Sequence, residues 1–219
     1  MYLVAIKIFR ISIAFVIASI EIDGVCVLLK RFFDFFFSFL CLLLFWPLIL
    51  FAWLIAAIDT RSNGFFLQNR VGRYGKCFTL IKIKTMYDTT VFESKISTCN
   101  DPRITKVGAF FRKTKIDELP QLINVFLGEM SFVGPRPDVP GYADKLKGAD
   151  RVILQLRPGM TGPASIKYRN EELILSKKNN PEEYNDFVIW PDKVRINKEY
   201  FESYSFSKDL KYIIQTIKG

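Results

Sequence analysis

Hydrophobic residues are distributed very unevenly along this chain. The run from Phe35 to Ile58 contains 24 residues without a charge, bordered by Lys30, Arg31 and Asp34 before it and by Asp59 after it. As one straight helix this run would be about 36 Å long, which is enough to cross the hydrocarbon core of a bilayer. The pattern therefore predicts a membrane helix, and a spanning helix is its simplest form.

Pro47 and the flanking charges favour a different geometry. A proline at mid-helix kinks or breaks the helix, and here it divides the run into halves of about 18 Å each. Basic residues flank both ends of the run, with Lys30 and Arg31 before it and Arg61 after it, and such residues favour the cytoplasmic side. A Pro-broken re-entrant helix within residues 30–59 satisfies both observations, so a spanning and a re-entrant form both remain open on these grounds.

Residues 1–29 form an N-terminal extension with more than one interpretation. Lys7 and Arg10, followed by the apolar segment Ile11–Ile20, resemble the first two regions of a signal peptide, but the acidic residues that follow make a poor cleavage region. The apolar core is also too short to span a bilayer. An interfacial helix and translated sequence upstream of the true start are both compatible with this pattern.

Residues 60–219 have the pattern of a cytosolic α/β domain that is rich in helix and contains a small β-hairpin. Apolar and polar residues alternate from Cys77 to Met86, and the preceding segment, Phe65–Lys76, contains a glycine turn. A hairpin is therefore expected here, with Lys82 and Lys84 on one face. Taken alone, these lysines indicate only a solvated polar face.

The rest of this domain shows helical spacing. Residues 87–100 lack periodicity and predict a surface loop, after which Lys106–Lys115 predicts a helix with its aromatic residues on one side. A second helix is expected after Asp117 and ends at Gly128, a residue that commonly closes helices. The Leu and Ile residues between positions 210 and 217 give an amphipathic closing helix.

The charge of the chain changes this picture because it is concentrated in one region. The formal net charge is +9, yet residues 1–59 carry four basic and four acidic residues. Residues 60–118 contain twelve Lys and Arg against five Asp and Glu, and residues 119–219 contain fifteen against thirteen. The excess therefore directly follows the apolar run, where a protein that lies on anionic lipid or receives anionic substrates needs it.

The absence of histidine from the sequence excludes several classes of site. With no histidine, catalytic triads that depend on an imidazole, histidine general bases and most zinc sites are ruled out. The four cysteines have no CxxC spacing, so reduced thiols that bind no metal are expected in a protein that faces the cytosol.

Two acidic residues close to several basic residues are the strongest candidates for catalytic residues. Asp117 and Glu118 follow the basic segment Arg112–Lys115 after a single residue. An isolated Asp-Glu pair would indicate only the first turn of a helix. Here a further cation is present in Arg136, which lies between two prolines and therefore has little conformational entropy to lose on binding phosphate. Carboxylates among cations suit an enzyme that handles phosphates with a metal and a carboxylate nucleophile.

Several ordered motifs occur together between residues 30 and 219. They are Lys30-Arg31-x-x-Asp34, the apolar run that contains Pro47, Gln68-x-Arg70-x-Gly72-x-x-Gly75-Lys76, Lys82-x-Lys84-Thr85-Met86, Asp101-x-Arg103-x-Thr105-x-x-Gly108, Arg112-Lys113-Thr114-x-x-Asp117-Glu118-Leu119-Pro120-Gln121-Leu122-x-Asn124-Val125, Gly128-x-Met130-Ser131-x-Val133-Gly134-Pro135-Arg136-Pro137 and Arg157-Pro158-Gly159-x-Thr161-Gly162. In this combination the chain resembles the compact form of the bacterial sugar transferases, which are monotopic polyprenyl-phosphate phosphoglycosyl transferases.

The resemblance implies a reaction and its location. A phosphosugar would pass from a UDP-sugar to polyprenyl (undecaprenyl) phosphate with release of UMP, at the cytosolic face of the bacterial inner membrane and among its lipids. Such a reaction begins the assembly of capsule, O-antigen, exopolysaccharide or glycoprotein.

The resemblance also implies residue roles. Asp117 would form a covalent phosphosugar, Glu118 would help to hold Mg²⁺, and Lys82, Arg112 and Arg136 would face phosphate. Structural or membrane roles fall on four further residues, namely Lys30, Arg31, Asp34 and Pro47.

Two other functions fit parts of the pattern. A membrane-anchored, Mg²⁺-dependent glycosyltransferase or hydrolase would use the same carboxylates without a covalent intermediate and would release UDP or sugar phosphate. A basic peripheral protein that binds nucleic acid or lipid would suit the charge of +9. The rigid Pro135-Arg136-Pro137 and the segment Asp117–Gln121 have no part in such binding, so no nucleic-acid partner is expected.

Overall fold

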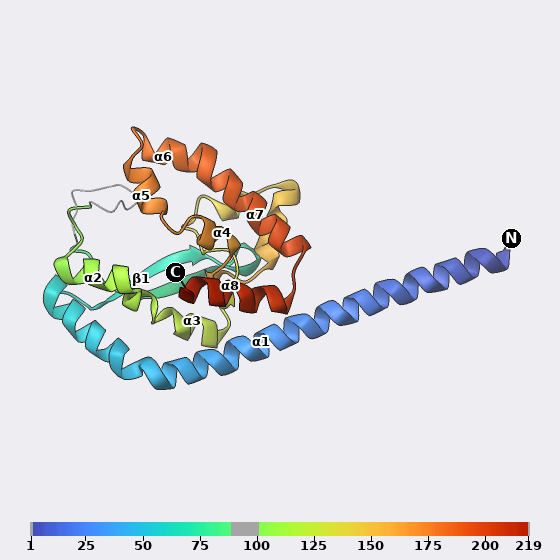
Figure 1. Ribbon diagram of the computed structural model, residues 1–219, viewed down its shortest axis with the longest axis horizontal. Coiled ribbons are helices and arrows are strands. Elements are labelled where there is room, and N and C mark those ends of the chain that lie inside the picture. The colour runs from blue at the N-terminus through green and yellow to red at the C-terminus, as the bar shows by residue number, and fades with distance from the viewer. Residues whose placement is uncertain (1, 89–100, 219) are drawn as a thin grey trace.

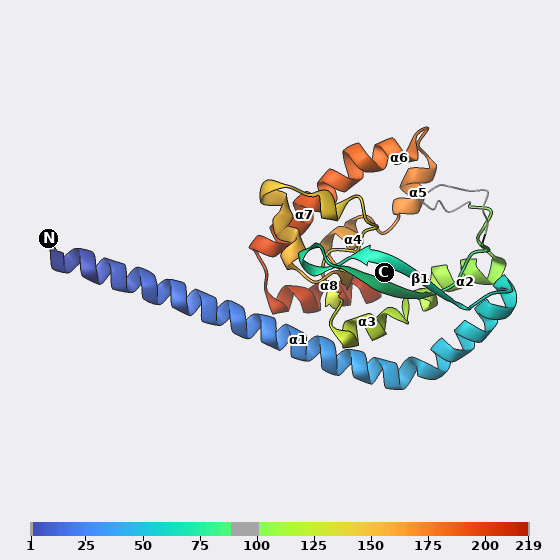
Figure 2. The same cartoon turned by 180° about the vertical axis from the view of Figure 1, so that it is seen from behind.

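A single long helix dominates the N-terminal part of the computed structural model, which describes residues 2–88 and 101–218. Helix α1 (Tyr2–Thr60) continues through Pro47 without interruption. It runs straight away from the rest of the protein on its N-terminal side and curves around the globular part in the region that contains Pro47 (Figures 1 and 2). The helix is therefore not broken at the proline, and it also continues across the expected boundary between residues 29 and 30.

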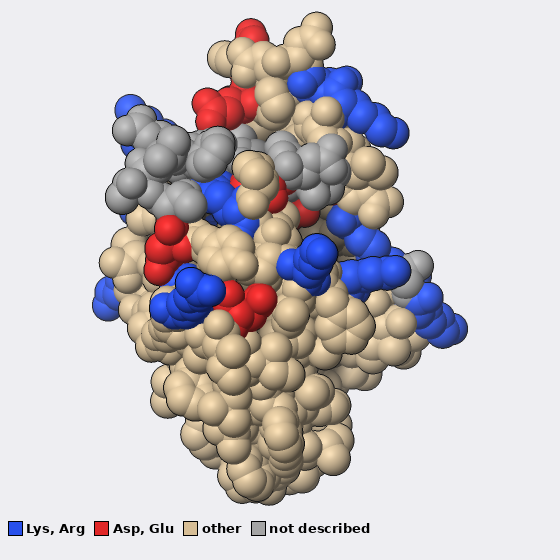
Figure 3. All heavy atoms as spheres, turned by 90° about the vertical axis from the view of Figure 1, so that its left-hand side faces the viewer, with Lys and Arg blue, Asp and Glu red and all other residues tan. Residues whose placement is uncertain are grey.

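The apolar part of α1 is largely exposed. The segment Val27–Thr60 is long and apolar enough to cross a membrane, and its exposed side chains include Phe32, Leu44, Phe51 and Ile58. In Figure 3 the lower part of the molecule shows no charged side chain, and Lys, Arg, Asp and Glu gather above it. Because exposed apolar surface of this extent is costly in water, this end of the protein is suited to association with a membrane.

A two-stranded antiparallel hairpin follows the helix, as the alternating pattern predicts. Strands β1 (Phe65–Val71) and β2 (Cys77–Ile83) pair in register from Phe65 opposite Ile83 to Val71 opposite Cys77. The turn between them is short, and Gly75 adopts a positive φ of 77°, which glycine does at little cost. The first two residues of the loop expected at 87–100 are extended or irregular, and the rest of it lies outside the described residues.

The expected helices on either side of Asp117 are also confirmed. Helix α2 (Lys106–Thr114) begins at Thr105, whose hydroxyl accepts a hydrogen bond of 2.7 Å from the backbone N–H of Gly108. Helix α3 (Gln121–Leu127) ends at Gly128, which has a left-handed φ of 87°. The short 3₁₀ turn η2 (Ile116–Glu118) joins the two helices.

The remaining chain forms short elements and two longer helices. Strands β3 and β4 pair in parallel, which the sequence did not predict, and an amphipathic helix closes the chain as expected. The elements are β3 (Ser131–Val133), the 3₁₀ segments Ala143–Lys145 and Gly148–Gln155, β4 (Gly159–Thr161), α4 (Pro163–Lys167), α5 (Glu171–Ser176), α6 (Pro181–Tyr184), the π-helix Asn185–Ile189, α7 (Trp190–Glu202) and α8 (Phe206–Lys218).

The core connects the C-terminal turns of α1 to the globular domain. Ala52 and Ala56, with 2% and 1% of their surface exposed, pack with Ile83 of β2 and Phe111 of α2. A second buried cluster joins the hairpin to α3 and the segment that follows it, and consists of Phe78, Leu80, Val125 and Met130. The small alanine side chains allow the helix to approach the hairpin closely, so this end of α1 is part of the domain's core.

Lys30 fastens the helix to the C-terminal part of the chain. Its ammonium group forms an ion pair with Asp209 at the start of α8 and donates a hydrogen bond of 3.0 Å to the carbonyl of Val133. Only 2% of Asp209 is exposed, and its other oxygen accepts a bond of 2.5 Å from the hydroxyl of Tyr200 on α7. A buried carboxylate requires such partners, so three distant segments meet at this ion pair.

Arg31 and Asp34 fasten the next turn. Arg31 donates hydrogen bonds of 2.8 Å to the carbonyls of Val125 and Phe126 in the last turn of α3, where the N–H groups of a following turn are missing. Asp34 is buried and accepts a bond of 3.1 Å from the backbone N–H of Phe132. The Lys-Arg-x-x-Asp motif therefore joins α1 to α3 and β3, the two elements that follow the Asp117 turn.

Candidate active site

Asp117 and Glu118 lie in the 3₁₀ turn between α2 and α3. Helix α2 ends at Lys115, which has a left-handed φ of 60°, and this residue redirects the chain into the turn. Asp117 is 7% exposed, and its Oδ1 atom is buried and has no hydrogen-bond partner among the residues that the structure describes. Buried polar atoms almost always have a hydrogen-bond partner, so an unpaired carboxylate oxygen at this position indicates a functional role rather than a structural one.

Burial changes the proton affinity of this carboxyl group. Burial first, and the neighbouring Glu118 second, raise the pKa of Asp117 to about 6 from an ordinary value of 3.8. Lys82 and Lys115 oppose this shift without cancelling it. Asp117 is therefore a carboxylate at neutral pH, but one with an unusually strong affinity for a proton or another electrophile.

Glu118 lies between two cations from different parts of the fold. Its Oε1 atom is 3.1 Å from the ammonium group of Lys82 on β2 and 3.0 Å from the guanidinium group of Arg136. Burial alone would raise the pKa of Glu118, but Arg136 and Lys82 outweigh it and hold the pKa far below its ordinary value. The two adjacent carboxyl groups thus have opposite shifts, which is the pattern expected where they have different roles.

The hairpin is what brings Lys82 to this pair. Leu80 and Ile83 are both buried, on opposite faces of β2, and Lys82 reaches Glu118 from the face that also carries Leu80. Burial lowers the pKa of Lys82, and Glu118 opposes that shift. The side chain of Lys82 is 18% exposed. Its charge is therefore less screened by water than the charge of a surface lysine.

Close contact between two backbone segments holds Arg136 in place. A Cβ atom at Gly134 would lie 2.2 Å from the carbonyl oxygen of Arg157, and one at Gly159 would lie 2.1 Å from the amide nitrogen of Gly134. Such distances are far below van der Waals contact, so only glycine fits at either position. Because Pro135 and Pro137 also fix the backbone on each side of Arg136, its side chain starts from a rigid loop.

Arg112 is the one expected phosphate-facing residue that bonds elsewhere in this structure. Its guanidinium group forms an ion pair with Glu172 on α5 and not with Asp117 or Glu118. It is still close enough to lower the pKa of Asp117 slightly. The structure therefore brings Lys82, Glu118 and Arg136 into direct contact with one another, and leaves Arg112 at the border of the group.

Arg70 and Asp138 extend the charged group, and the sequence did not single them out for chemistry. Burial raises the pKa of Asp138 to about 7, against the effects of Lys193 and Arg70. Burial, followed by Arg136, lowers the pKa of Arg70 to about 10. Arg70 donates a bond of 3.0 Å to the carbonyl of Pro137. The position of Asp138 directly after Pro137 was the available sequence signal.

Comparison with known proteins identifies the family. The model of a family described as bacterial sugar transferase matches residues 25–219. The chain belongs to this family. It is 35% identical over 193 residues to a Bacillus subtilis protein named uncharacterized sugar transferase EpsL, which covers 88% of this chain and 87% of that protein.

Two further relatives have more specific names. The exopolysaccharide production protein ExoY of Rhizobium meliloti is 32% identical over 204 residues, covering 86% of this chain and 83% of the relative. The undecaprenyl-phosphate galactose phosphotransferase of Salmonella typhimurium is 32% identical over 208 residues. That match covers 87% of this chain but 40% of the Salmonella protein, so this member of the sugar transferase family matches less than half of that relative.

Proposed function

We propose that this protein transfers a phosphosugar from a UDP-sugar to polyprenyl phosphate, with release of UMP, through a covalent intermediate on Asp117. The observation that carries the proposal is the pairing of an unbonded, buried Asp117 oxygen with a Glu118 that two cations hold ionised. The name of the Salmonella relative, an undecaprenyl-phosphate galactose phosphotransferase, supports the lipid acceptor.

The first step uses Asp117 as the nucleophile. One of its carboxylate oxygens attacks the phosphorus that bears the sugar, a P–O bond to that phosphorus forms, and the P–O bond to the leaving phosphate breaks with its electrons on UMP. Lys82 and Arg136 supply fixed positive charge beside the pair, and thereby reduce the repulsion between a carboxylate and a diphosphate. No histidine is required, since Asp117 is already ionised at neutral pH.

The second step restores Asp117. An oxygen of the polyprenyl phosphate attacks the same phosphorus, a new P–O–P linkage forms, and the bond to Asp117 breaks and returns its electrons to the carboxylate. An acyl phosphate keeps a high transfer potential, so both steps can proceed at a single centre. The raised pKa of Asp117 fits a group that is both nucleophile and leaving group.

The residues at this centre also fit a role for Mg²⁺. In the described part of the chain, no three Asp, Glu, Cys or His side chains gather to form a metal site by themselves. Mg²⁺ often takes one or two protein carboxylates and completes its shell with substrate phosphates and water. Glu118 would supply the carboxylate, and the ion would neutralise charge on the diphosphate when bound.

We further propose that α1 enters and leaves the membrane on one side. A straight helix between Arg31 and Ala56 would separate these residues by about 38 Å, yet both are bound to the same globular domain. The large apolar side chains between them are mostly exposed. A domain fastened to both arms of the helix is difficult to reconcile with arms on opposite faces of a bilayer.

Topology reporters test this arrangement. A reporter inserted before Lys30 and another fused after Gly219 are both expected to be accessible from the cytosol in intact cells. Accessibility of the two reporters from opposite sides would refute the proposed geometry and would favour a spanning helix.

Release of UMP is the decisive test of the reaction. Purified protein in nanodiscs with Mg²⁺ and polyprenyl phosphate is given a panel of UDP-sugars, and the nucleotide product is identified. UMP from at least one donor, and its loss in Asp117→Asn, are expected. Release of UDP would support a glycosyltransferase, and activity of Asp117→Asn near that of the wild type would exclude Asp117 as the nucleophile. Lys145→Gln, a change at an exposed lysine outside this centre, is a suitable control.

A further inference from the structure

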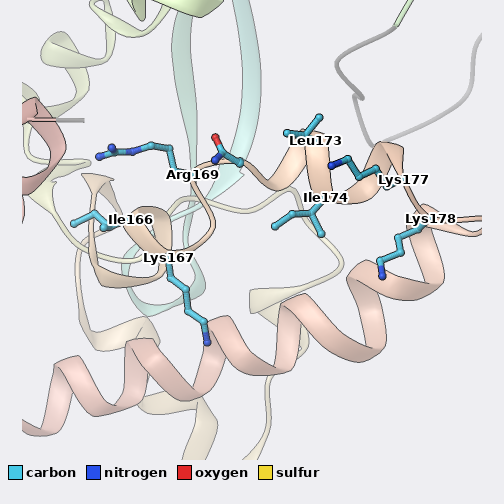
Figure 4. Close-up of a pocket in the computed structure, with 8 residues that line it drawn as sticks. Ile166, Lys167, Arg169, Leu173, Ile174, Lys177 and Lys178 are labelled. Carbon is cyan, nitrogen blue, oxygen red and sulfur yellow. The ribbon is translucent and has the colours of Figure 1, made fainter.

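A second cationic cavity lies outside the Asp117 centre. Its volume is about 520 Å³, within the range of about 300–1,000 Å³ of small-molecule sites, and the described residues that line it belong to α4, α5 and the segments directly after these helices. Figure 4 shows Lys167 and Lys178 extending toward the helix below from opposite ends, with Ile174 between them. No acidic residue is among the described residues that line it, whereas four are basic, namely Lys167, Arg169, Lys177 and Lys178.

Among the described residues, most of this positive charge has no carboxylate partner. Lys167 forms an ion pair of 2.6 Å with Asp192 on α7. Arg169 donates a bond of 3.1 Å to the backbone carbonyl of Gln215, and the ammonium group of Lys178 lies 4.1 Å from the centre of the Tyr184 ring. A carbonyl and an aromatic ring orient a cation but leave its charge available to an anion.

The walls of the cavity are fixed by contacts elsewhere. Leu175 of α5 is 2% exposed, and Glu171 of the same helix forms an ion pair of 2.6 Å with Lys193. Glu172 forms an ion pair with Arg112. Helix α5 is therefore held in place before any ligand arrives, which lowers the entropy cost of binding.

The composition of the lining specifies the class of ligand. Three basic side chains without acidic partners suit a phosphate group, for which Arg and Lys are the usual ligands. Ile166, Leu173 and Ile174 give the cavity an apolar part, which suits the carbon skeleton attached to that phosphate. We propose that this cavity is a phosphate-ester binding site distinct from the Asp117 centre, with Arg169, Lys177 and Lys178 as its cationic ligands.

Direct binding measurements test this proposal independently of turnover. Full-length Asp117→Asn protein is placed in phosphatidylcholine nanodiscs and titrated with glycerol 3-phosphate by calorimetry. A second set of nanodiscs contains phosphatidic acid, and native mass spectrometry counts the lipids that stay bound. The cavity variant is Lys177→Gln with Lys178→Gln, and the matched control is Lys145→Gln with Lys147→Gln, two exposed lysines that do not line the cavity.

We expect the cavity variant to bind the phosphate ligand about tenfold more weakly or worse, because two charge-assisted contacts are lost, while the control matches the parent. Weaker binding of glycerol 3-phosphate would identify a soluble phosphate ester as the ligand, and loss of retained phosphatidic acid alone would identify a lipid. Equal binding by the cavity variant and the control, in both measurements, would overturn the proposal. Unchanged circular dichroism and melting temperature of both variants would exclude misfolding as the cause.

Discussion

Replacing Asp117 by asparagine is expected to stabilise the protein while it abolishes turnover. The pKa of about 6 in the folded chain, compared with 3.8 for an ordinary aspartate, corresponds to about 3 kcal/mol of destabilisation when the carboxyl group is ionised. Asparagine removes the buried charge but introduces an amide that needs partners of its own, at a cost of about 1 kcal/mol. The net gain is therefore about 2 kcal/mol, or about 4–8 °C in melting temperature for a chain of this size.

The pH dependence of this gain distinguishes its cause. For an acid whose pKa is raised by folding, the penalty is complete above the folded pKa of about 6 and is absent below the unfolded value of 3.8. The gain in stability of Asp117→Asn over the wild type should therefore be largest at pH 7 and should disappear between pH 5 and pH 4, where only the cost of the amide remains. Thermal unfolding in detergent at several pH values, followed by tryptophan fluorescence, measures both effects.

Glu118→Gln supplies a matched control with the opposite sign. Glu118 bonds to both Lys82 and Arg136 and its pKa is lowered, so removal of its charge leaves two cations close together. Loss of about 3 kcal/mol is expected. A lower melting temperature for Asp117→Asn than for the wild type at pH 7, or a gain in melting temperature that persists unchanged at pH 4, would show that the buried charge of Asp117 does not destabilise the folded protein.

Two further predictions concern the proton of Asp117 and the attachment of the membrane helix. The rate of covalent labelling by a UDP-sugar without polyprenyl phosphate should fall about tenfold from pH 7 to pH 5, because Asp117 with a pKa of about 6 must be ionised to attack; a flat profile would contradict this. Lys30→Met should lower the free energy of unfolding by about 3 kcal/mol, since it leaves the buried Asp209 without its cation. Lys30→Met with Asp209→Asn should recover part of that loss, and simple additivity of the two single effects would refute the coupling.

The local elements of the fold could be predicted from the sequence because their causes are local. Alternation from Cys77 to Met86 placed the second strand of the hairpin, and Gly128 ended α3 where expected. The parallel pair β3–β4 could not be predicted in the same way. Each strand has three residues, which is too short for a period of two to be recognised, and the pairing depends on glycines 25 residues apart at Gly134 and Gly159.

At the candidate site, the contacts that could not be predicted join residues that are far apart in the sequence. The pattern around Asp117 suggested nearby cations, and Lys82 and Arg136 do meet Glu118. The pairing of Arg112 with Glu172 joins residues 60 positions apart, and no local pattern specifies such a pair. Pro47 was expected to break α1, but a bend suffices, because the helix continues on both sides of it and packs on the domain.

The crossing of the two glycine-rich segments has a consequence for genetics. Harmful substitutions in a packed core can often be suppressed by a smaller residue at a neighbouring position, because side chains meet side chains there. At Gly134 and Gly159 an added carbon would instead meet backbone atoms, at 2.2 and 2.1 Å, and backbone cannot be made smaller. Second-site mutations should therefore fail to restore function to variants at these two positions, and reversion to glycine should be the main way in which function returns.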